Sequence, residues 1–424
     1  MKKVLIVSYY FPPYTGIEGH RAFSWYTHFK KTGFWPCIVT RHWKEGAQQT
    51  WKDYQTDSGE TLEINRSKMG EIHRLPYRAN STFTKFNKIP LLRGIYYWIQ
   101  KILGNVQIET DAYVNFYEYC RKLCIIEKPD FILVTSPPLN IIRIASKLYD
   151  EFEIPYAVDF RDAYNNNLLN SSYQPSLRVR MEDFMFKYYI KKWLKNASFF
   201  VGVSKPVNNL TLNIIEKPSF VITNGFDAEV FNTITFIPDD IFRITIMGTI
   251  YIIQDVDFMI KGFNLFLNSA KRDDILIQFI GLGQNSLVGK KIIQNIDGKY
   301  LHITDRLPRK QAFKYFNSTS MLYFLGWLGY KGIYSGKLFE YLGTGLPILI
   351  APGDRDVMDE LLKETEAGLS AISPEEMSRI LNEWYSLWSS KNKIPVYPNP
   401  SVKEYTRESQ AILLSDIIKK HVSA

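Results

Sequence analysis

A short run in the second half of the chain carries residue types that bind phosphate and hydroxyl groups. It consists of Ser335, Gly336, Lys337 and Leu338, followed closely by Glu340. Ser335 is a typical N-cap, so the first helical turn after it would present free backbone N–H groups and the positive end of a helix dipole. Lys337 adds a full positive charge, and Glu340 lies on the same helix face, where its carboxylate can accept two hydroxyl groups. The pattern predicts a site for a diphosphate and a ribose.

The same run has a plainer interpretation. A lysine and a glutamate three positions apart also form an ordinary surface pair on a helix, and Gly345 is a common helix C-cap. The surrounding elements have to decide between the two interpretations.

A second group of charged residues follows an apolar segment in the first half of the chain. Asp159, Arg161 and Asp162 come at the end of the expected strand Tyr156–Asp159. Open α/β sheets bind ligands at this end of their strands, where a carboxylate can accept a proton from an acceptor hydroxyl or hold sugar hydroxyls. We choose Asp162 as the catalytic carboxylate and Asp159 as the reserve. The alternative is a structural ion pair between Arg161 and one of them.

The loop after the first expected strand contains Gly16, Gly19 and Arg21. It lacks the third glycine of the dinucleotide fingerprint, which argues against a nicotinamide enzyme. Its small residues would let the loop approach donor phosphates, with Arg21 as a charge partner. Alternatively, the two glycines only turn the chain into the next helix.

Short apolar runs alternate with longer amphipathic stretches, as in parallel sheets with crossover helices. Helices are expected at Val256–Ser269 and Arg309–Phe316. The expected strands are Lys3–Ser8, Trp35–Thr40, Phe131–Thr135, Tyr156–Asp159, Phe199–Val203, Phe220–Ile222, Ile244–Met247, Ile275–Ile280, Tyr300–Ile303, Met321–Phe324 and Pro347–Ile350. Their continuous apolar character predicts burial on both faces.

A chain of 424 residues exceeds what one core usually supports, so two domains of about 200 residues are expected. The polar, Pro-containing stretch 232–240 marks the boundary. We therefore expect an N-terminal domain at 1–237 and a C-terminal domain at 238–403, the second of which contains the predicted diphosphate and ribose site. The amphipathic segment 404–424 is expected to pack back on the first domain.

Composition and charge narrow the setting. The N-terminus has no signal-peptide pattern, no run approaches 18 apolar residues, and neither the three cysteines nor the six histidines show metal-ligand or disulfide spacing. These features favour a cytoplasmic protein without a metal.

The formal charge is +9, and residues 66–104 hold eight Lys/Arg against one acid. Because basic residues alternate with apolar ones over 85–104, this segment is expected to contact an anionic membrane surface. The alternative is that its apolar face packs on the first domain. No nucleic-acid recognition signature is present.

In this order and spacing, several motifs resemble glycosyltransferase family 4 and its close relatives over nearly the whole chain. They are VLIVSYYFPP at 4–13 with Gly16 and Gly19, VDFRD at 158–162, VS at 203–204, ITNGFD at 222–227, MGT at 247–249, and the Lys337/Glu340 run.

The resemblance implies an α/β protein of the GT-B architecture, with two Rossmann-like doubly wound domains that face each other across a cleft. It implies that Glu340 binds the donor ribose, that the backbone at 336–338 meets the diphosphate, and that Gly248, Thr249, Asp305 and Arg306 line the donor side. For Asp305 and Arg306 a loop ion pair is an equal alternative.

Two departures stand out. Many relatives have a second glutamate eight positions before the first, where this chain has Gly332, and the usual Arg and Lys are absent from 248–251. Lys337 is expected to supply the phosphate charge instead.

The expected activity is transfer of a sugar from a nucleotide-diphosphate sugar to a glycan or lipid-linked acceptor, without cofactor or metal. Retention of the anomeric configuration and a role in cell-envelope polysaccharide biosynthesis follow from the resemblance. The segment 85–104 adds the expectation of a peripheral protein on the cytoplasmic face of the membrane. A sugar-nucleotide epimerase of the same fold and a non-catalytic binding partner remain as alternatives.

Overall fold

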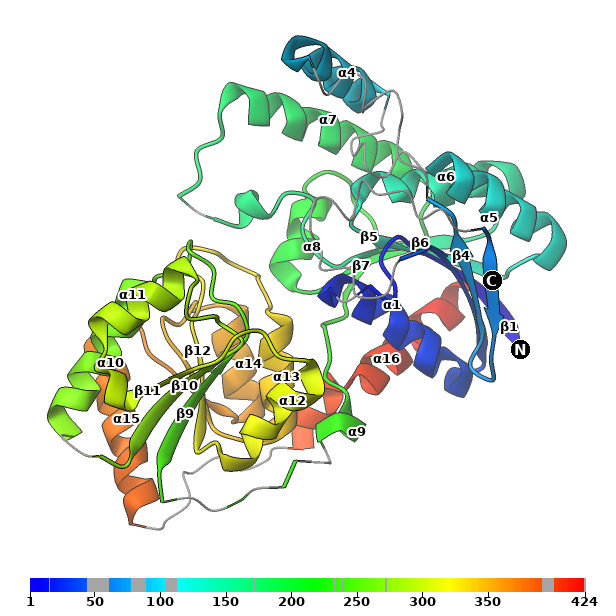
Figure 1. Ribbon diagram of the computed structural model, residues 1–424. Coiled ribbons are helices and arrows are strands. Elements are labelled where there is room, and N and C mark those ends of the chain that lie inside the picture. The colour runs from blue at the N-terminus through cyan, green and yellow to red at the C-terminus, as the bar shows by residue number, and fades with distance from the viewer. Residues whose placement is uncertain are drawn as a thin grey trace. The chain divides into compact units, whose positions relative to one another are not determined.

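The computed structural model describes residues 1–14, 16–43, 61–77, 89–103, 113–170, 172–231, 234–235, 237, 240–270, 273–390 and 400–422. These residues form a mixed α/β protein with two compact units (Figure 1). The first unit comprises Met1–Leu169, Tyr173–Thr223 and Glu408–Ala424, and the second comprises Asn170–Ser172 and Asn224–Arg407.

The first unit is built on an eight-stranded sheet with the order β3-β4-β2-β1-β5-β6-β7-β8. All neighbours run parallel except β3 and β4, the antiparallel pair at one edge. The strands are β1 (Lys2–Ser8), β2 (Phe34–Arg41), β3 (Glu63–Arg66), β4 (Glu71–Leu75), β5 (Phe131–Ser136), β6 (Tyr156–Phe160), β7 (Phe199–Gly202) and β8 (Ser219–Val221). Strands β5, β6 and β7 are buried over their whole length because the sheet has a core on each face.

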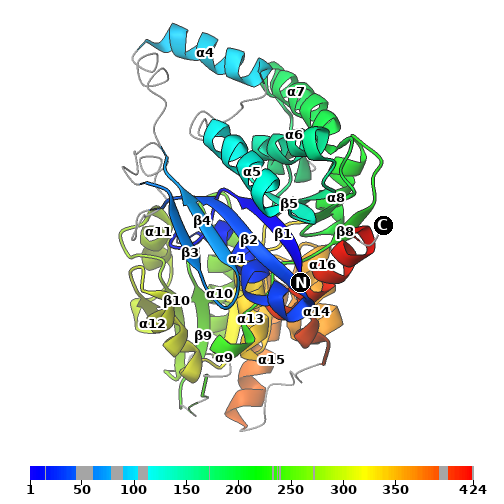
Figure 2. The same cartoon turned by 90° about the vertical axis from the view of Figure 1, so that its right-hand side faces the viewer.

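Successive residues of the central strands enter the two different cores, because side chains alternate across a strand. Leu5 and Val7 of β1 pack with residues of α5, α6 and α7, whereas Val4 and Ile6 pack with residues of α1 and α16 (Figure 2). The helices of this unit are α1 (Ile17–His28), α4 (Pro90–Ile102), α5 (Tyr113–Glu127), α6 (Ile142–Phe152), α7 (Leu177–Leu194), α8 (Lys205–Leu212) and α16 (Arg407–Val422), whose first residue belongs to the second unit.

The second unit is built on a six-stranded parallel sheet with the order β11-β10-β9-β12-β13-β14. Helices α10, α11 and α15 cover one face, and α9, α12, α13 and α14 cover the other. The strands are β9 (Phe242–Met247), β10 (Ile275–Ile280), β11 (Leu301–Ile303), β12 (Met321–Phe324), β13 (Ile348–Ile350) and β14 (Gly368–Ser370). The helices are α9 (Ala228–Phe231), α10 (Val256–Ala270), α11 (Leu287–Asn295), α12 (Arg309–Phe313), α13 (Gly336–Thr344), α14 (Val357–Thr365) and α15 (Pro374–Ser389).

The second unit begins earlier than the composition indicates. The expected boundary lay at 237–238, but the unit starts at Asn224, because Phe226 and Phe231 pack in the same core as α13 and α14. At the other end, Ala411 and Leu414 of α16 are fully buried in the core that contains Trp25 of α1. Among the described residues, no helix has both the length and the apolarity needed to cross a membrane.

The strand order of the second sheet reverses between β9 and β12. From β9 the chain continues to β10 and β11 on one side and then returns to place β12 on the other side. In open α/β sheets, ligands bind outside the carboxyl ends of the strands at such a reversal. We therefore expect the ligand site of this unit among the residues that follow β9, β10, β11 and β12.

Candidate functional site

Helix α13 begins where the sequence predicts it, and both of its ends are capped. The Ser335 side chain accepts a hydrogen bond from the Lys337 backbone N–H at 3.3 Å, and Gly345 ends the helix in the left-handed conformation with φ 68°. Because the helix follows β12, its N-terminus is positioned by a strand at the reversal of the sheet. The exposed positive end of the helix dipole is thus fixed at the carboxyl edge of this sheet.

The Lys337 side chain reaches across this edge to the loop after β9. Its Nζ donates a hydrogen bond to the Thr249 carbonyl oxygen. The side chain passes directly over Gly248, where a Cβ atom would lie 2.8 Å from the Lys337 Cε. Gly248 also has φ +80°, so this position requires glycine both for its backbone conformation and for the passage of the lysine.

The electrostatic state of Lys337 suits an anion. Burial lowers the pKa of Lys337 to about 8, and the charge of Glu340 acts in the opposite direction. Among the residues that the structure describes, no carboxylate forms an ion pair with this ammonium group. A partly buried cation whose hydrogen bond goes to a carbonyl oxygen gains strongly from a phosphate group.

The loops after β10 and β11 are joined to each other at the same edge. The backbone N–H of Gly281 donates to the Thr304 Oγ1 at 2.9 Å, and the N–H of Gly283 donates to the Thr304 carbonyl oxygen at 3.0 Å. Asp305 and Arg306 follow directly and are exposed. The structure therefore brings the predicted donor-side residues of the second unit to one edge of one sheet.

Glu340 lies one turn further along α13 and is held by a residue that the sequence analysis did not select. The Arg309 Nη2 donates to the Glu340 Oε1 at 2.7 Å. The exposed fractions of the two side chains are 37% and 22%. In the described part of the chain, the Glu340 Oε2 accepts no hydrogen bond. One carboxylate oxygen thus fixes the side chain, and the other is available to a hydroxyl group.

A second arginine contributes to the potential around Glu340. Burial and the charge of Arg309 lower the pKa of Arg407, whereas Glu340 and Asp227 raise it. Arg309 had a local signal, since it is a basic residue that begins a helix after a strand and loop. Arg407 had none, because it comes from a distant part of the chain.

Gly332, eight residues before Glu340, forms a hydrogen bond with a carboxylate. Gly332 has φ 72°, and its backbone N–H donates to the Asp356 Oδ2 at 2.5 Å. Asp356 is the N-cap residue of α14. The carboxylate near this position therefore comes from α14 and not from position 332, where many relatives have a glutamate. Sequence spacing alone did not reveal it.

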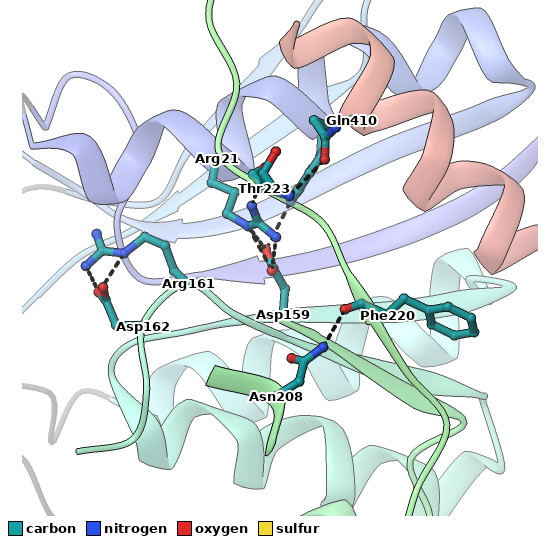
Figure 3. A network of polar contacts seen from close by, with 9 residues as sticks. Arg21, Asp159, Arg161, Asp162, Asn208, Phe220, Thr223 and Gln410 are labelled. Carbon is teal, nitrogen blue, oxygen red and sulfur yellow. Dashed lines mark hydrogen bonds and ion pairs between the residues drawn. The ribbon is translucent and has the colours of Figure 1, made fainter. Parts of the chain in front are cut away.

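In the first unit, Asp159 and Arg21 form a closed pair (Figure 3). The Arg21 Nε donates to the two Asp159 oxygens at 2.8 and 2.9 Å, and the Arg21 Nη1 donates to the Thr223 carbonyl oxygen at 2.9 Å. The Trp25 Nε1 donates to the Asp159 Oδ2 at 3.3 Å. Asp159 has no exposed surface, so this geometry makes it and Arg21 structural, in contrast to the proton-accepting and ligand-binding roles expected from the sequence.

Asp162 is paired but accessible. The Arg161 Nε donates to the Asp162 Oδ2 at 2.9 Å, and the Arg161 Nη1 lies 3.3 Å from the Glu18 Oε1 in the first turn of α1. The exposed fraction is 38% for the Asp162 side chain and 13% for that of Arg161. The ion pair named as an alternative is thus present, and it leaves the Asp162 Oδ1 without a hydrogen bond from any described residue.

The two glycines after β1 have local structural roles. A Cβ on Gly19 would lie 3.2 Å from the Phe11 Cα, so glycine allows α1 to pack closely against the preceding loop. Gly16 is the N-cap residue of α1 and provides no side-chain hydrogen bond to the helix. For Gly19 the geometry favours the interpretation that the glycine only turns the chain into the next helix.

No family model and no curated protein matches the sequence. Among solved structures, sucrose-phosphate synthase from Thermosynechococcus elongatus is similar over 100% of both chains, with a TM-score of 0.63 and 11% identity. The catalytic domain of starch synthase IV from Arabidopsis thaliana, bound to ADP and acarbose, is similar over 100% of both chains, with a TM-score of 0.57 and 10% identity.

A putative UDP-N-acetylglucosamine 2-epimerase from Listeria monocytogenes is also similar, over 100% of this chain and 97% of that chain, with a TM-score of 0.55 and 12% identity. At such identities the likeness shows the fold alone. The chain has the GT-B architecture, with one parallel-sheet Rossmann-like domain in each unit, and the fold-class prediction is confirmed. Membership in glycosyltransferase family 4 stays a prediction.

Proposed function

We propose that this protein is a glycosyltransferase that moves a sugar from a nucleotide-diphosphate sugar to a glycan or lipid-linked acceptor. The observation that carries the proposal is the N-terminus of α13 at the reversal of the second sheet, with Lys337 and Glu340 on its first turns. The fold is shared with solved glycosyltransferases, one of which holds ADP. In this chain the diphosphate lies at Lys337 and the helix N-terminus, and the ribose hydroxyls bind the free Oε2 of Glu340.

The proposed reaction breaks the bond between the anomeric carbon and the β-phosphate oxygen and forms a bond from that carbon to an acceptor oxygen. Negative charge develops on the leaving diphosphate, where Lys337 and the fixed helix dipole stabilise it without reorganisation. Asp162 takes the acceptor proton, and Arg161 fixes the orientation of its carboxylate through the Oδ2. In this proposal Lys337 and the helix dipole take the place of a divalent cation. Retention of the anomeric configuration is proposed from the resemblance to family 4 and not from this step; an inverted anomer in early product by NMR would contradict it.

The test is release of nucleoside diphosphate from a panel of nucleotide sugars in the presence of envelope extract as acceptor source. Lys337→Ala is expected to lower the rate about 10²- to 10³-fold, as removal of one donor at a developing negative charge does. Lys363→Ala removes an exposed lysine of α14 and is the matched control. Equal rates in both variants would contradict the proposal. Asp162→Asn with full turnover would remove Asp162 from the mechanism.

An epimerase is the second candidate, because one similar structure carries that name. An epimerase converts the nucleotide sugar without any acceptor, whereas a transferase releases a nucleoside diphosphate only when the sugar is transferred or hydrolysed. Analysis of the sugar nucleotide after incubation without acceptor separates the two functions. A changed sugar on an intact nucleotide would favour the epimerase.

The acceptor side of the proposal includes an anionic membrane surface at α4. Residues 85–88 and 104 of the expected segment lie outside the described residues. Within α4, Leu91, Ile95, Ile99 and Ile102 form an apolar stripe with exposed fractions between 47% and 75%. Lys101 differs from the expectation, because it is buried in an ion pair with Glu182 of α7 at 2.9 Å and does not face outward.

The neighbouring helix α7 supplies the outward charge. Figure 1 shows α4 beside α7, and Tyr97 and Lys101 of α4 both contact Glu182. The second acid of α7, Asp183, is paired with Lys187. The exposed side chains of α7 are apolar at one set of positions and basic at another: Leu177, Met181, Phe184 and Tyr188, and Arg178, Arg180, Lys191 and Lys192. Apolar residues flanked by cations fit anionic lipid.

Sedimentation with vesicles of anionic and of neutral lipid tests this surface. The chain is expected to bind anionic vesicles at low salt, and Ile95→Glu with Ile99→Glu is expected to abolish binding. The control, Ile293→Glu, changes an exposed isoleucine of α11 in the other unit. No binding of the wild-type chain to anionic vesicles would end the membrane part of the proposal. We propose that the protein acts in cell-envelope polysaccharide biosynthesis at the cytoplasmic face of the membrane.

A further inference from the structure

Three potential metal ligands meet on two neighbouring strands of the first sheet. Cys37 of β2 lies opposite Glu71 of β4 in the parallel register, and His73 follows two residues after Glu71, hence on the same face. One ligand atom from each of the three side chains lies within 4.8 Å of the others. Figure 2 shows β2 and β4 side by side. Sequence spacing did not indicate this group, because its members are brought together by strand pairing.

The His73 ring is buried and held in a fixed orientation by Tyr119. The side chain is 3% exposed, and its Nδ1 lies 2.7 Å from the Tyr119 hydroxyl, a hydrogen bond that fixes the ring. The other ring nitrogen, Nε2, is buried and has no hydrogen-bond partner, although it lies 3.4 Å from the Glu71 Oε2. The contact between this nitrogen and the carboxylate is long and poorly aligned for a hydrogen bond, and a cation bound between the two groups would satisfy both.

From this geometry we infer that Cys37, Glu71 and His73 form a zinc-binding site. Tetrahedral zinc has bonds of about 2.0–2.3 Å to N, O and S ligands, so its ligand atoms are about 3.3–3.8 Å apart. The separation of 3.4 Å between His73 and Glu71 already meets this requirement. The Cys37 Sγ lies within 4.8 Å of the other two ligand atoms, so it needs to approach by at most about 1.5 Å. A thiolate with an imidazole selects zinc over the hard cations Mg²⁺ and Ca²⁺, and the Tyr119 contact orients the histidine from behind.

Charge and access are consistent with a bound dication. On binding, the Cys37 thiol gives its proton to solvent as the sulfur–zinc bond forms, so Cys37 and Glu71 together neutralise the ion. Cys37 and Glu71 line a narrow cavity together with Lys3 and Glu127. Lys3 and Glu127 form an ion pair with each other and are 39% and 32% exposed, so they stand at the solvent side. Arg66 lies 3.5 Å from Glu71 and is the competing partner of this carboxylate.

The site serves the structure of the first unit and lies apart from the proposed chemistry. Glu71 is the first residue of β4, and Cys37 lies in the first half of β2. Asp162, by contrast, follows the carboxyl end of the parallel strand β6. Zinc would fasten β4, and with it the antiparallel edge strand β3, to β2. The inference is therefore independent of the proposed transferase activity.

The experiment loads the full chain, after removal of metal by a chelator, with Zn²⁺ or Co²⁺. We expect one zinc per chain after desalting and a thiolate-to-cobalt charge-transfer band in the near ultraviolet. Cys37→Ser is expected to remove the band and lower zinc affinity at least tenfold, whereas Cys124→Ser, at a buried cysteine outside the group, keeps both. His73→Gln is the second test variant, with circular dichroism to check folding.

Alkylation of the wild-type chain gives a readout that does not depend on any variant. Zinc is expected to protect Cys37 from alkylation, as measured by mass spectrometry of the Cys37 peptide, without changing the rate at Cys124. Substoichiometric zinc, a cobalt band that survives Cys37→Ser, or equal Cys37 alkylation with and without zinc would each overturn the inference.

Discussion

Each of the two units contains an arginine–carboxylate pair. The pairs differ in their exposure and in the number of carboxylate oxygens that already accept hydrogen bonds. Arg21 and Asp159 in the first unit are buried, and the carboxylate accepts hydrogen bonds from both Arg21 and Trp25. Arg309 and Glu340 in the second unit are partly exposed and share one hydrogen bond of 2.7 Å. In the first pair both carboxylate oxygens accept hydrogen bonds, whereas the second pair leaves one carboxylate oxygen for a ligand.

The number of hydrogen bonds that the carboxylate accepts and its exposed fraction therefore distinguish a pair that stabilises the fold from a pair that can bind a ligand. A buried carboxylate with all its acceptor capacity used offers nothing to a substrate, and its loss leaves an uncompensated charge. A partly exposed pair contributes little to stability, and its second carboxylate oxygen can accept a hydroxyl group while the arginine stays bound to the first.

Asp159→Ala is expected to have the largest effect, on folding. It leaves the Arg21 guanidinium buried without its partner, and breaking a buried pair costs about 3–5 kcal/mol. Glu340→Ala is expected to change the free energy of unfolding by less than about 1 kcal/mol. Urea denaturation followed by circular dichroism measures both. Equal losses in the two variants would abolish the distinction between the pairs.

Lys337→Ala is expected to lower kcat/KM about 10²- to 10³-fold while raising thermal stability. The folded-state pKa of Lys337, about 8, lies below the ordinary value of 10.5, so folding disfavours its proton. The resulting cost is fully present below pH 8, declines between pH 8 and 10.5, and is absent above that range. Calorimetry at pH 7 and pH 10.5 should therefore show a gain in Tm at pH 7 that shrinks at high pH. A lower Tm at pH 7 would contradict this account of the lysine.

The pH dependence of donor binding gives the smallest expected effect. Only the protonated form of Lys337 attracts a diphosphate, so the affinity for nucleoside diphosphate should fall about tenfold per pH unit above the pKa, which is about 8 in the free protein. The bound phosphate raises that pKa, which moves the fall to higher pH in the complex. Isothermal titration between pH 7 and pH 10 measures the slope. The Lys337→Ala variant should bind weakly, with no such slope; a slope that persists in this variant would assign the titration to another group.

Much of the fold could be predicted from the sequence, because buried parallel strands form continuous apolar runs. The run Lys3–Ser8, for example, matches β1 at Lys2–Ser8. Strands β3, β4 and β14 were missed, because polar, charged or glycine residues interrupt each of them and none forms a continuous apolar run. The start of the second unit was also misplaced, because the packing of Phe226 and Phe231 depends on a core formed by distant residues.

The site could be predicted only where its signal was local. The N-cap Ser335, the spacing of Lys337 and Glu340, and the C-cap Gly345 all lie within one helix, and the structure forms that helix as expected. The partner of Asp159 lies 138 residues away, so no local pattern revealed that this carboxylate is enclosed. Arg309 had a local signal as a basic residue at a helix start, but its pairing with Glu340, 31 residues away, had none.

Binding of nucleoside diphosphates tests the central claim most directly. In a thermal-shift panel of UDP, ADP, GDP and TDP, at least one is expected to stabilise the wild-type chain, by about 2.7 kcal/mol at 100 times its dissociation constant. The shift should disappear in Lys337→Ala and be reduced in Glu340→Ala, whereas Lys363→Ala should keep it. A nucleoside diphosphate that stabilises the wild type and both site variants equally would contradict the placement of the donor at α13.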